Sequence, residues 1–370
     1  MGRKLLICIG LAMLLCVGRA SAYSASAYAV LSANTGVLLD GSRENIQLPM
    51  ASTTKIMTGL LAAEQPDLDR IITVPTSCAG IEGSSMYLQA GEKLPLREVL
   101  YGLMLCSGND AAECIAAVCG GRDVFVAHMN ERAKQLGLTH THFDNPSGLD
   151  GKSHYTTAYE LAKLAAFALK NETFAQVVAS KSYTSKTRTM TNHNKMLRLY
   201  DDAIGVKTGY TQTAGRCLVS AAKRNGRTVV AVTLNDRDDW NDHTQMLNAA
   251  FDGMKTQYWA KKGDLAAKIP VQTGEKSTVS AVCQNDLCAT LMKQEQADIS
   301  ISYIPFLYAP IKKGDICGYA QVVCGDVVLC ESPLICSTSV AMDDTQEDTS
   351  RWERIRLWFD HICGREVQID

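Results

Sequence analysis

The chain has 370 residues, of which 46% are hydrophobic and 21% charged, a balance typical of folded globular proteins and not of disordered chains. At about 150 residues per domain, this length predicts two or three domains. Lysine and arginine number 37 and aspartate and glutamate 39, so the net charge of −2 leaves no basic excess to bind a polyanion, and we expect no nucleic-acid partner.

The first 22 residues are typical of a secretory signal peptide. Two basic residues, Arg3 and Lys4, precede an apolar run over 5–17, and a small-residue exit at 20–22 follows. We therefore expect cleavage after Ala22 and export of the mature chain. The alternative is an uncleaved anchor, although the run is shorter than the about 20 apolar residues that span a bilayer.

Cysteine is frequent, with 14 residues in the full chain. An exported protein can form disulfides, but spacing does not give their connectivity, and a reducing habitat would leave the thiols free. No Cys-x-x-Cys pair occurs, so a zinc ribbon or a thioredoxin-type site has little support. His140 and His142 could be two ligands on a strand, but no third accompanies them, and we expect neither a metal nor a cofactor.

Strand and helix patterns alternate in blocks along the first part of the chain. In chain order they predict strands at 28–32 and 37–39, helices over 56–64, 96–105, 111–118 and 157–169, strands at 217–222 and 228–234, and a helix over 244–254. Strands, a helical block and strands again indicate an α/β fold in which an antiparallel sheet carries a helical insertion. We expect this first domain to span residues 23–257.

The remaining sequence changes character. Short strands with frequent turns are predicted at 269–271, 278–282, 297–303, 316–323 and 327–330. They predict a small β-rich domain at 258–336. The polar, acidic residues 337–350 are typical of a linker, and residues 351–370 are predicted to form an amphipathic helix.

Ser52 and Lys55 stand at the start of the first predicted helix. Their spacing places them one turn apart on one face. A lysine there can take the hydroxyl proton if burial lowers its pKa, and a helix N-terminus favours developing negative charge. The alternative is that Ser52 is an N-cap. Ser220 and Lys223 repeat the spacing, but within a strand pattern.

Two further motifs carry polar groups suited to a cleft. The loop Ser-Gly-Asn at 107–109 lies between two predicted helices and could present a hydroxyl and an amide, although these are also ordinary turn residues. The Lys-Thr-Gly at 207–209 precedes the later strand pair. On an edge strand such a lysine and hydroxyl can hold a carboxylate, and the glycine permits close backbone approach.

Ser-x-x-Lys, Ser-Asp-Asn and Lys-Thr-Gly, in this order, are the motif set of penicillin-binding proteins and class A β-lactamases. On these motifs the chain resembles the low-molecular-mass penicillin-binding proteins of the D-alanyl-D-alanine carboxypeptidase type, in which Ser-Gly-Asn is the typical variant. The resemblance extends over about residues 28–251, while the β-rich domain and terminal helix match in arrangement more than in residues. The matching stretches read ASTTKIMT at 51–58, SGNDAA at 107–112, FDNPSGL at 143–149 and GVKTGYT at 205–211.

The resemblance implies catalytic roles for residues of the first two motifs. Ser52 would be the nucleophile that becomes acylated, and Lys55 its general base. Ser107 would relay protons, and Asn109 would hold the substrate peptide. The fold implied is the penicillin-binding/β-lactamase-like transpeptidase fold.

The third motif would bind the end of the substrate. By resemblance, Lys207 and Thr208 hold its terminal carboxylate, with Gly209 beside them, and the backbone N–H of Tyr210 joins that of Ser52 in an oxyanion hole. His193 lies where relatives often place a basic residue near that carboxylate. A surface histidine is the alternative.

The function implied is a serine-type D-alanyl-D-alanine carboxypeptidase that removes the terminal D-alanine of peptidoglycan stem peptides and binds β-lactams covalently, in cell-wall biogenesis. A β-lactamase would need a placed carboxylate base, and no matching glutamate motif occurs. For a transpeptidase, nothing in the sequence selects an amine acceptor over water. A non-catalytic cell-wall scaffold is the alternative of another class, and the intact motifs argue against it.

The predicted terminal helix has one apolar stripe, flanked by arginines. Its residues are Trp352, Ile355, Trp358, Phe359 and Ile362. Such a helix fits a membrane interface, and the resemblance points to anchoring on the outer face of the cytoplasmic membrane. The alternative is a helix packed on the protein's own surface.

Overall fold

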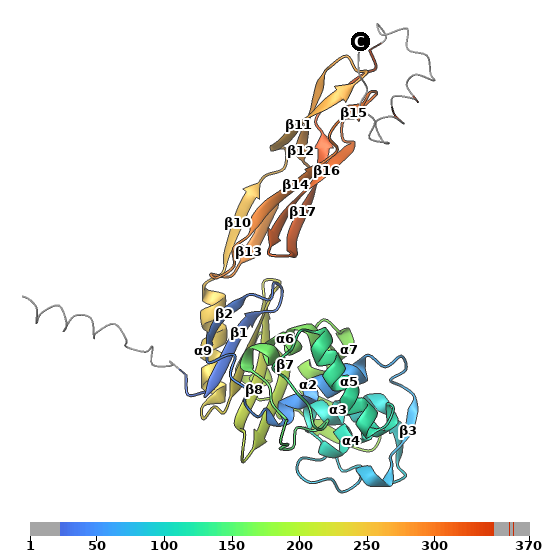
Figure 1. The fold of residues 1–370 in the computed structure, drawn as a ribbon, viewed down its shortest axis with the longest axis vertical. Coiled ribbons are helices and arrows are strands. Elements are labelled where there is room, and N and C mark those ends of the chain that lie inside the picture. Colours follow the sequence, from blue (N-terminus) through green and yellow to red (C-terminus); the bar gives the residue numbers. More distant parts are fainter. Residues whose placement is uncertain (1–22, 344–354, 356–357, 359–370) are drawn as a thin grey trace, which may run out of the picture. The chain divides into compact units, whose positions relative to one another are not determined.

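The computed structural model describes residues 23–343 together with Ile355 and Trp358. The chain divides into two compact units (Figure 1). The first comprises Met1–Lys255 with the short segment Met292–Glu295, and the second comprises Thr256–Leu291 with Gln296–Asp370. The division thus falls at 255/256, where the sequence predicted 257/258, and a short later segment belongs to the first unit.

A five-stranded antiparallel sheet forms the centre of the first unit. Its strands, in spatial order, are β2 (Leu38–Ser42), β1 (Ala27–Ser32), β9 (Arg227–Leu234), β8 (Gly215–Arg224) and β7 (Ala203–Thr211). The predicted hairpin at 28–39 is confirmed and supplies one edge. Strand β7, which carries the Lys-Thr-Gly motif, is the other edge.

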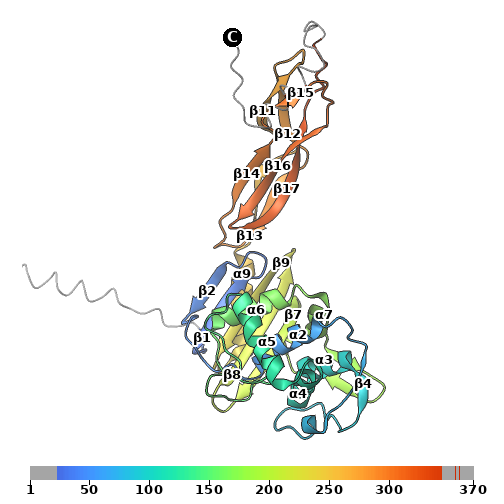
Figure 2. The same ribbon diagram turned by 45° about the vertical axis from the view of Figure 1, so that its right-hand side comes forward.

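Strand β1 shows how the sheet is covered on both faces. Ala27, Ala29 and Leu31 pack into the core shared with the helical block, while Tyr28 and Val30 belong to a second core. The alternation follows from the two-residue period of a strand. Helix α9 (Asp239–Asp252) covers that second face, and the helical block lies on the opposite side of the sheet (Figure 2).

The helical block contains all the helices that the sequence predicted between the two sets of strands, and α9 confirms the last one. Its elements are the 3-10 turn η1 (Ala51–Thr54) and helices α2 (Lys55–Ala63), α3 (Leu96–Leu105), α4 (Asn109–Val118), α5 (Arg122–Gln135), α6 (Ala158–Ala168), α7 (Glu172–Ala179) and α8 (Met196–Leu199). The turn η2 (Thr76–Cys78) and two small hairpins, β3 (Ile71–Thr73) with β4 (Lys93–Pro95) and β5 (Ser182–Thr184) with β6 (Thr189–Thr191), complete it.

Helix α5 was not predicted. Among its residues only Phe125, Met129 and Ala133 are buried, a stripe one residue wide at intervals of four. Most of the helix faces solvent, so its apolar signal in the sequence is thin.

Up to residue 343, the second unit is built mainly of strands, as predicted. A six-stranded sheet has the order β14 (Asp298–Tyr303), β16 (Ile316–Cys324), β17 (Val327–Cys336), β12 (Thr278–Cys283), β11 (Leu265–Gln272) and β15 (Leu307–Tyr308), and β10 (Lys255–Ala260) pairs with β13 (Leu287–Leu291). All five predicted strands occur, but β17 continues past Cys330 through Pro333. The pairing of β12 with β17 ends at Leu334. Pro333 therefore has no β12 residue opposite it that would need a hydrogen bond from the N–H that proline lacks.

The start of the expected linker is folded instead. Val340 is buried and pairs with Ile311, and Met342 pairs with Gly274. Residues 337–343 therefore extend the second unit, because an apolar side chain within this polar stretch finds a place in its core.

The expected signal peptide and most of the expected terminal helix lie outside the described residues. Ile355 and Trp358 are helical, with about half of each side chain exposed. Within the described part of the chain, no helix has the length and apolar character needed to cross a bilayer.

Candidate active site

Ser52 lies in the turn η1, directly before helix α2. Ala51 has a positive φ of 49°, and the hydroxyl of Thr54 donates to its carbonyl oxygen at 2.8 Å. The N-cap residues of η1 and α2 are Met50 and Thr54, so Ser52 does not cap either element. Its hydroxyl is therefore available for another task.

Lys55 is fully buried, and its Nζ lies among three oxygens. They are Ser52 Oγ at 2.9 Å, Asn109 Oδ1 at 2.7 Å and the Ser147 carbonyl oxygen at 2.5 Å. The amide and the carbonyl oxygens can only accept, so a neutral amine can donate its two hydrogens to them and turn its lone pair to the serine hydroxyl. Burial, reinforced by the charge of Lys207, lowers the pKa of Lys55 well below that of an ordinary lysine and favours this form.

The Ser-Gly-Asn motif joins α3 to α4. Ser107 is buried and has a positive φ of 59°, and Asn109 is the first residue of α4. Besides accepting from Lys55, the Asn109 amide donates through Nδ2 to the Glu82 carbonyl oxygen at 2.6 Å, and its backbone N–H donates to that of Ser84 at 2.7 Å. The amide thus links the lysine to the loop of residues 82–92.

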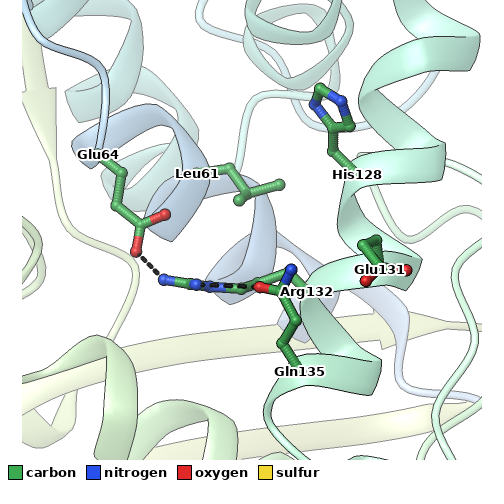
Figure 3. Close-up of a pocket in the computed structure, with 6 residues that line it drawn as sticks. All are labelled: Leu61, Glu64, His128, Glu131, Arg132 and Gln135. Carbon is green, nitrogen blue, oxygen red and sulfur yellow. Dashed lines mark hydrogen bonds and ion pairs between the residues drawn. The ribbon is translucent and has the colours of Figure 1, made fainter.

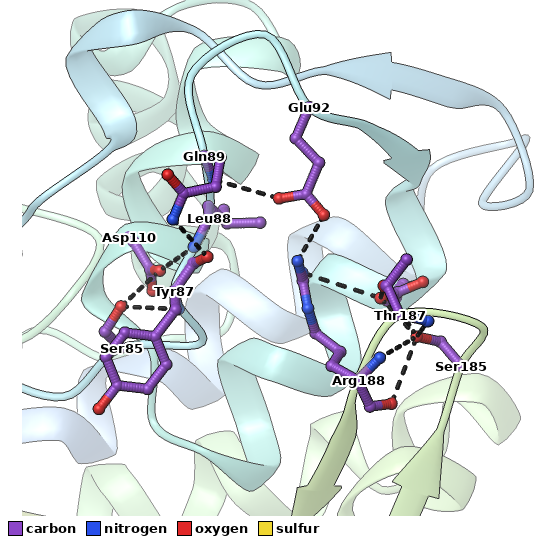
Figure 4. Close-up of polar contacts among 10 residues, drawn as sticks. Ser85, Tyr87, Leu88, Gln89, Glu92, Asp110, Ser185, Thr187 and Arg188 are labelled. Atoms are coloured by element: carbon purple, nitrogen blue, oxygen red, sulfur yellow. Dashed lines mark hydrogen bonds and ion pairs between the residues drawn. The ribbon is translucent and has the colours of Figure 1, made fainter.

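That loop is held by polar contacts along its length (Figure 4). Asp110, next to Asn109, accepts from the Ser85 hydroxyl at 2.7 Å and from the Leu88 backbone N–H at 3.0 Å. Arg188 forms an ion pair with Glu92 at the far end. These contacts fix the loop against the start of α4.

Strand β7 brings the Lys-Thr-Gly motif against the nucleophile's turn. A Cβ added to Gly209 would lie 3.1 Å from the backbone nitrogen of Ser52, tighter than ordinary packing, so the two backbones meet with little room for a side chain. Lys207 is 1% exposed, and its Nζ donates to the Thr208 carbonyl oxygen at 2.9 Å. Burial lowers the pKa of Lys207 to about 7, although the charge of Cys106 opposes the shift.

Tyr210 and His193 also lie at this site. The Tyr210 side chain is 66% exposed, so the backbone N–H is the part that the oxyanion prediction concerns. The His193 backbone N–H donates to the Leu105 carbonyl oxygen at 3.1 Å, two residues before Ser107. Partial burial and the charge of Lys207 lower the pKa of His193, so its ring lies within electrostatic reach of that lysine.

Ser220, the second serine with a lysine three residues on, is not placed for catalysis. Its hydroxyl contacts His243 Nδ1 at 2.5 Å, and both side chains are fully buried on the α9 side of the sheet, whereas Lys223 is exposed. A substrate has no access to this serine–histidine pair. The pair is part of the core, where burial lowers the pKa of His243 to about 3.

A surface depression between α2 and α5 contains none of the motif residues (Figure 3). It is lined by Leu61, Glu64, His128, Glu131, Arg132 and Gln135. Arg132 spans it, with an ion pair to Glu64 and a hydrogen bond to Gln135 at 3.3 Å. The charge of Arg132 is thus paired with Glu64 within the protein.

The two histidines considered as ligands contact carboxylates on separate elements. His140 Nδ1 lies 3.3 Å from Glu160, and His142 Nδ1 lies 3.3 Å from Asp144. Among the residues that the structure describes, no three His, Cys, Asp or Glu side chains converge on a point that could hold a metal ion.

The structure adds groups that the motif analysis did not assign. The Ser147 carbonyl oxygen contacts the lysine, and the Glu82 carbonyl oxygen holds the Asn109 amide. Ser147 stands within FDNPSGL, one of the stretches that carries the resemblance, whereas nothing in the sequence around Glu82 marks it.

Two family profiles match the chain, and their ranges correspond to its two units. The profile of D-alanyl-D-alanine carboxypeptidase matches residues 17–238. This chain belongs to the D-alanyl-D-alanine carboxypeptidase family. A second profile, that of the C-terminal domain of penicillin-binding protein 5, matches residues 255–342 of this family member. The resemblance stated from the motifs is confirmed, and the chain is a serine peptidase of this family.

Relatives match over most of the chain. The D-alanyl-D-alanine carboxypeptidase DacF of Bacillus subtilis is 31% identical over 330 residues, which cover 85% of each chain. The D-alanyl-D-alanine carboxypeptidase DacD of Salmonella typhimurium is 29% identical over 341 residues, 86% of this chain and 87% of the relative.

Solved structures confirm the fold class. Penicillin-binding protein 5 of Haemophilus influenzae superposes with a TM-score of 0.64 over 86% of this chain and 98% of its own, and its 23% identity supports the fold alone. The Streptomyces DD-transpeptidase superposes with a TM-score of 0.59 at 34% identity, over 61% of this chain and 96% of its own.

Proposed function

We propose that the chain is a serine-type carboxypeptidase that removes the terminal D-alanine of peptidoglycan stem peptides through an acyl-enzyme on Ser52. The observation that carries the proposal is the set of three oxygens around the buried Lys55 Nζ, one of which is the Ser52 hydroxyl at 2.9 Å. Family membership supports the reaction class, and covalent binding of penicillin, typical of the family, follows from the same chemistry.

In acylation, the Ser52 hydroxyl proton passes to Lys55 Nζ as Oγ attacks the carbonyl carbon of the penultimate D-alanine. The backbone N–H groups of Ser52 and Tyr210 stabilise the tetrahedral oxyanion. The C–N bond then breaks, and the proton reaches the leaving amine through Ser107. This releases free D-alanine and leaves an ester on Ser52.

Deacylation uses the same groups with water as the nucleophile. A water gives a proton to the general base Lys55, and the water oxygen attacks the carbonyl carbon of the ester. The ester bond to Ser52 Oγ then breaks, and Oγ recovers a proton. The product is the shortened peptide. Lys207 and Thr208 hold the terminal carboxylate during acylation by charge-assisted hydrogen bonds, and Asn109 holds the peptide.

The test is incubation of the intact protein with a D-alanyl-D-alanine peptide and, separately, with a fluorescent penicillin. We expect release of D-alanine, and a penicillin adduct that peptide mapping assigns to Ser52. Ser52→Ala should abolish the adduct, while Ser220→Ala, a serine with the same spacing to a lysine, should retain it. A folded protein that forms no adduct would instead support a non-catalytic cell-wall role.

Transpeptidation is a second candidate because one similar structure, at 34% identity, is a DD-transpeptidase. In that reaction an amine replaces water in the second step. The two are separated by adding an acceptor amine and measuring the ratio of transferred to hydrolysed product. A ratio that stays low at high amine concentration supports the carboxypeptidase.

We further propose export and attachment to the outer face of the cytoplasmic membrane by the C-terminal helix. The signal-like start, the family and the apolar stripe that includes Ile355 and Trp358 support this. Each large apolar side chain contributes on the order of 1.5–3 kcal/mol if fully buried, and each flanking arginine roughly 1 kcal/mol at an anionic surface.

Deletion of residues 351–370, followed by cell fractionation, tests the attachment. We expect the shortened protein to leave the membrane fraction. If it stays there as completely as the intact chain, the helix is not the anchor, and an uncleaved signal peptide explains retention better.

A further inference from the structure

A histidine outside the three motifs contacts the turn that carries the nucleophile. His154 lies in the loop before α6 and is 5% exposed. Its Nε2 is 2.7 Å from Thr54 Oγ1, and its Nδ1 is 3.0 Å from the backbone nitrogen of Asp144. Thr54 stands between Ser52 and Lys55 in the turn, so the ring reaches this turn through Thr54.

The direction of these hydrogen bonds follows from the one group that cannot accept. The Asp144 backbone N–H can only donate, so His154 Nδ1 accepts and, in the neutral ring, Nε2 carries the proton. Nε2–H therefore donates to Thr54 Oγ1, and the Thr54 hydroxyl donates to the Ala51 carbonyl oxygen at 2.8 Å. All three hydrogen bonds run in sequence toward Ala51.

The Ala51 carbonyl belongs to the same rigid peptide unit as the Ser52 backbone N–H. Fixing the oxygen of this unit therefore also fixes the direction of that N–H. The unit needs such support because φ of Ala51 is +49°, a conformation that costs a non-glycine residue of order 1–3 kcal/mol. A Cβ on Gly148 would lie 2.0 Å from the Ala51 oxygen, so the backbone is tightly packed on this side as well.

We propose that His154 is a positioning residue for the oxyanion hole. Through Thr54 it orients the peptide unit of Ala51 and Ser52, so that the Ser52 N–H points to the site where the oxyanion develops. This role rests on the proposed function, in which that N–H is one of two oxyanion donors.

The role requires the neutral ring, since a proton on Nδ1 would face the Asp144 N–H with two donors. Burial is the main cause that lowers the pKa of His154 to about 4. The charges of His142 and Lys55 lower it further, while those of Asp144 and Asp150 raise it. The ring is therefore neutral across the range from pH 5 to pH 8.

The test compares the acylation rate constants with penicillin of His154→Asn, Thr54→Val and the double variant, all shown to be folded by circular dichroism. Loss of one oxyanion donor costs roughly 100- to 1,000-fold in other serine enzymes, so misalignment should slow acylation by about tenfold or more. Since both residues act through one peptide unit, the double variant should be no slower than the slower single one. Thr54→Ser, which keeps the hydroxyl, should restore the rate.

His243→Asn is the matched control for a purely structural effect. This histidine is also buried and contacts two hydroxyls, those of Ser220 and Thr233, but on the opposite face of the sheet. It should lower the thermal midpoint while the folded protein acylates at the unaltered rate. In 15N NMR spectra of the unaltered protein, His154 should show the Nε2–H tautomer from pH 5 to pH 8.

Three results would overturn the role of His154 alone: independent, multiplying effects of the two single variants, an unchanged acylation rate in His154→Asn, or a proton on Nδ1. Absence of any penicillin adduct in the unaltered protein is a different result. It would overturn the proposed function and, with it, the need for this role.

Discussion

Lys55 and Lys207 are both buried in the same site, and the charge of Lys207 disfavours a proton on Lys55. Burial lowers both pKa values, and the charge of Lys207 lowers that of Lys55 further. One lysine must be neutral to act as a base, and the other must be charged to hold a carboxylate. Their surroundings differ accordingly, since Lys55 Nζ lies among oxygens of three residues, whereas the hydrogen bonds of Lys207 Nζ within the described chain go to Thr208.

Replacing Lys207 tests whether this lysine binds the terminal carboxylate of the substrate. Lys207→Ala removes a charge-assisted hydrogen bond, worth about 1.5–3 kcal/mol, from substrates with a free carboxylate and not from their amides. We expect kcat/KM to fall roughly 10- to 100-fold for the acid and far less for the amide. Equal losses for both peptides would show that Lys207 does not bind the carboxylate.

The pKa of Lys207 also predicts a pH dependence. The ammonium form exists below its pKa of about 7 and is lost as the pH rises through that value. For a peptide with a free carboxylate, kcat/KM should therefore decline above about pH 7, while an amide substrate should show no such decline. At low pH, protonation of Lys55 removes the general base and so lowers kcat/KM. Because the pKa of Lys55 is lowered, this decline should occur at a pH far below the one expected for an ordinary lysine. Profiles of kcat/KM from pH 5 to pH 10 for the two substrates provide the measurement.

At the scale of elements, the site depends on how closely η1, β7 and the segment around Gly148 approach one another. Gly148 has a φ of +89°, and its missing side chain leaves room for the Ala51 carbonyl oxygen. Gly209 plays a similar part on β7, where the strand passes the backbone of Ser52. Backbone segments therefore confine the turn η1 from two sides. This holds Ser52 in position before a substrate binds.

Gly148→Ala should damage this arrangement more than an equally strained glycine elsewhere. Its Cβ would lie 2.0 Å from the Ala51 oxygen, so strain and overpacking together should cost roughly 2–5 kcal/mol of unfolding free energy and suppress the penicillin adduct. Gly91→Ala is the control, because its φ is +80° but no atom lies within 4 Å of the added Cβ. That variant should lose about 1–2 kcal/mol and acylate normally. Similar behaviour of both variants in urea unfolding and labelling would rule out the close approach as the cause.

At the scale of the whole molecule, the first unit is completed by residues from far along the chain. Glu295, in the segment Met292–Glu295, is buried and forms an ion pair with Arg227 of β9. The Thr35 hydroxyl donates to the same carboxylate at 2.5 Å, and the Met292 backbone N–H at 2.9 Å. A chain that ended at residue 255 would lack this carboxylate and leave the arginine buried with its charge uncompensated.

Glu295→Ala should therefore destabilise the first unit strongly. Removing one partner of a buried ion pair costs about 3–5 kcal/mol, because the other charge stays buried. Asp69→Ala is the comparison, since the pair of Asp69 with Arg97 lies at the surface, where solvent screens it and it contributes little to stability. Urea unfolding followed by loss of penicillin labelling reports on the first unit. A loss for Glu295→Ala no larger than for Asp69→Ala would contradict this account.

Much of this protein is determined by local sequence. The helices around the site follow from apolar periodicity, and the close spacing of Ser52 and Lys55 from a separation of three residues at a helix start. The order of the three motifs was enough to indicate the family, which the profile over residues 17–238 confirms. Local signals failed where an element contributes little to the core, as in α5, and where a strand continues through Pro333.

Other features were decided only by the tertiary structure. Ser52 and Lys55 were marked by their spacing, but the other two oxygens around the lysine come from Asn109 and Ser147, 54 and 92 residues away. The shift in its pKa comes from burial and from the charge of Lys207 on strand β7. His154 meets Thr54 across 100 residues. Such contacts join groups that no periodicity or spacing links, because their distance is set by how the sheet and the helical block pack. Local sequence therefore determined which chemical groups this protein carries, and the packing of distant segments decided their protonation and direction.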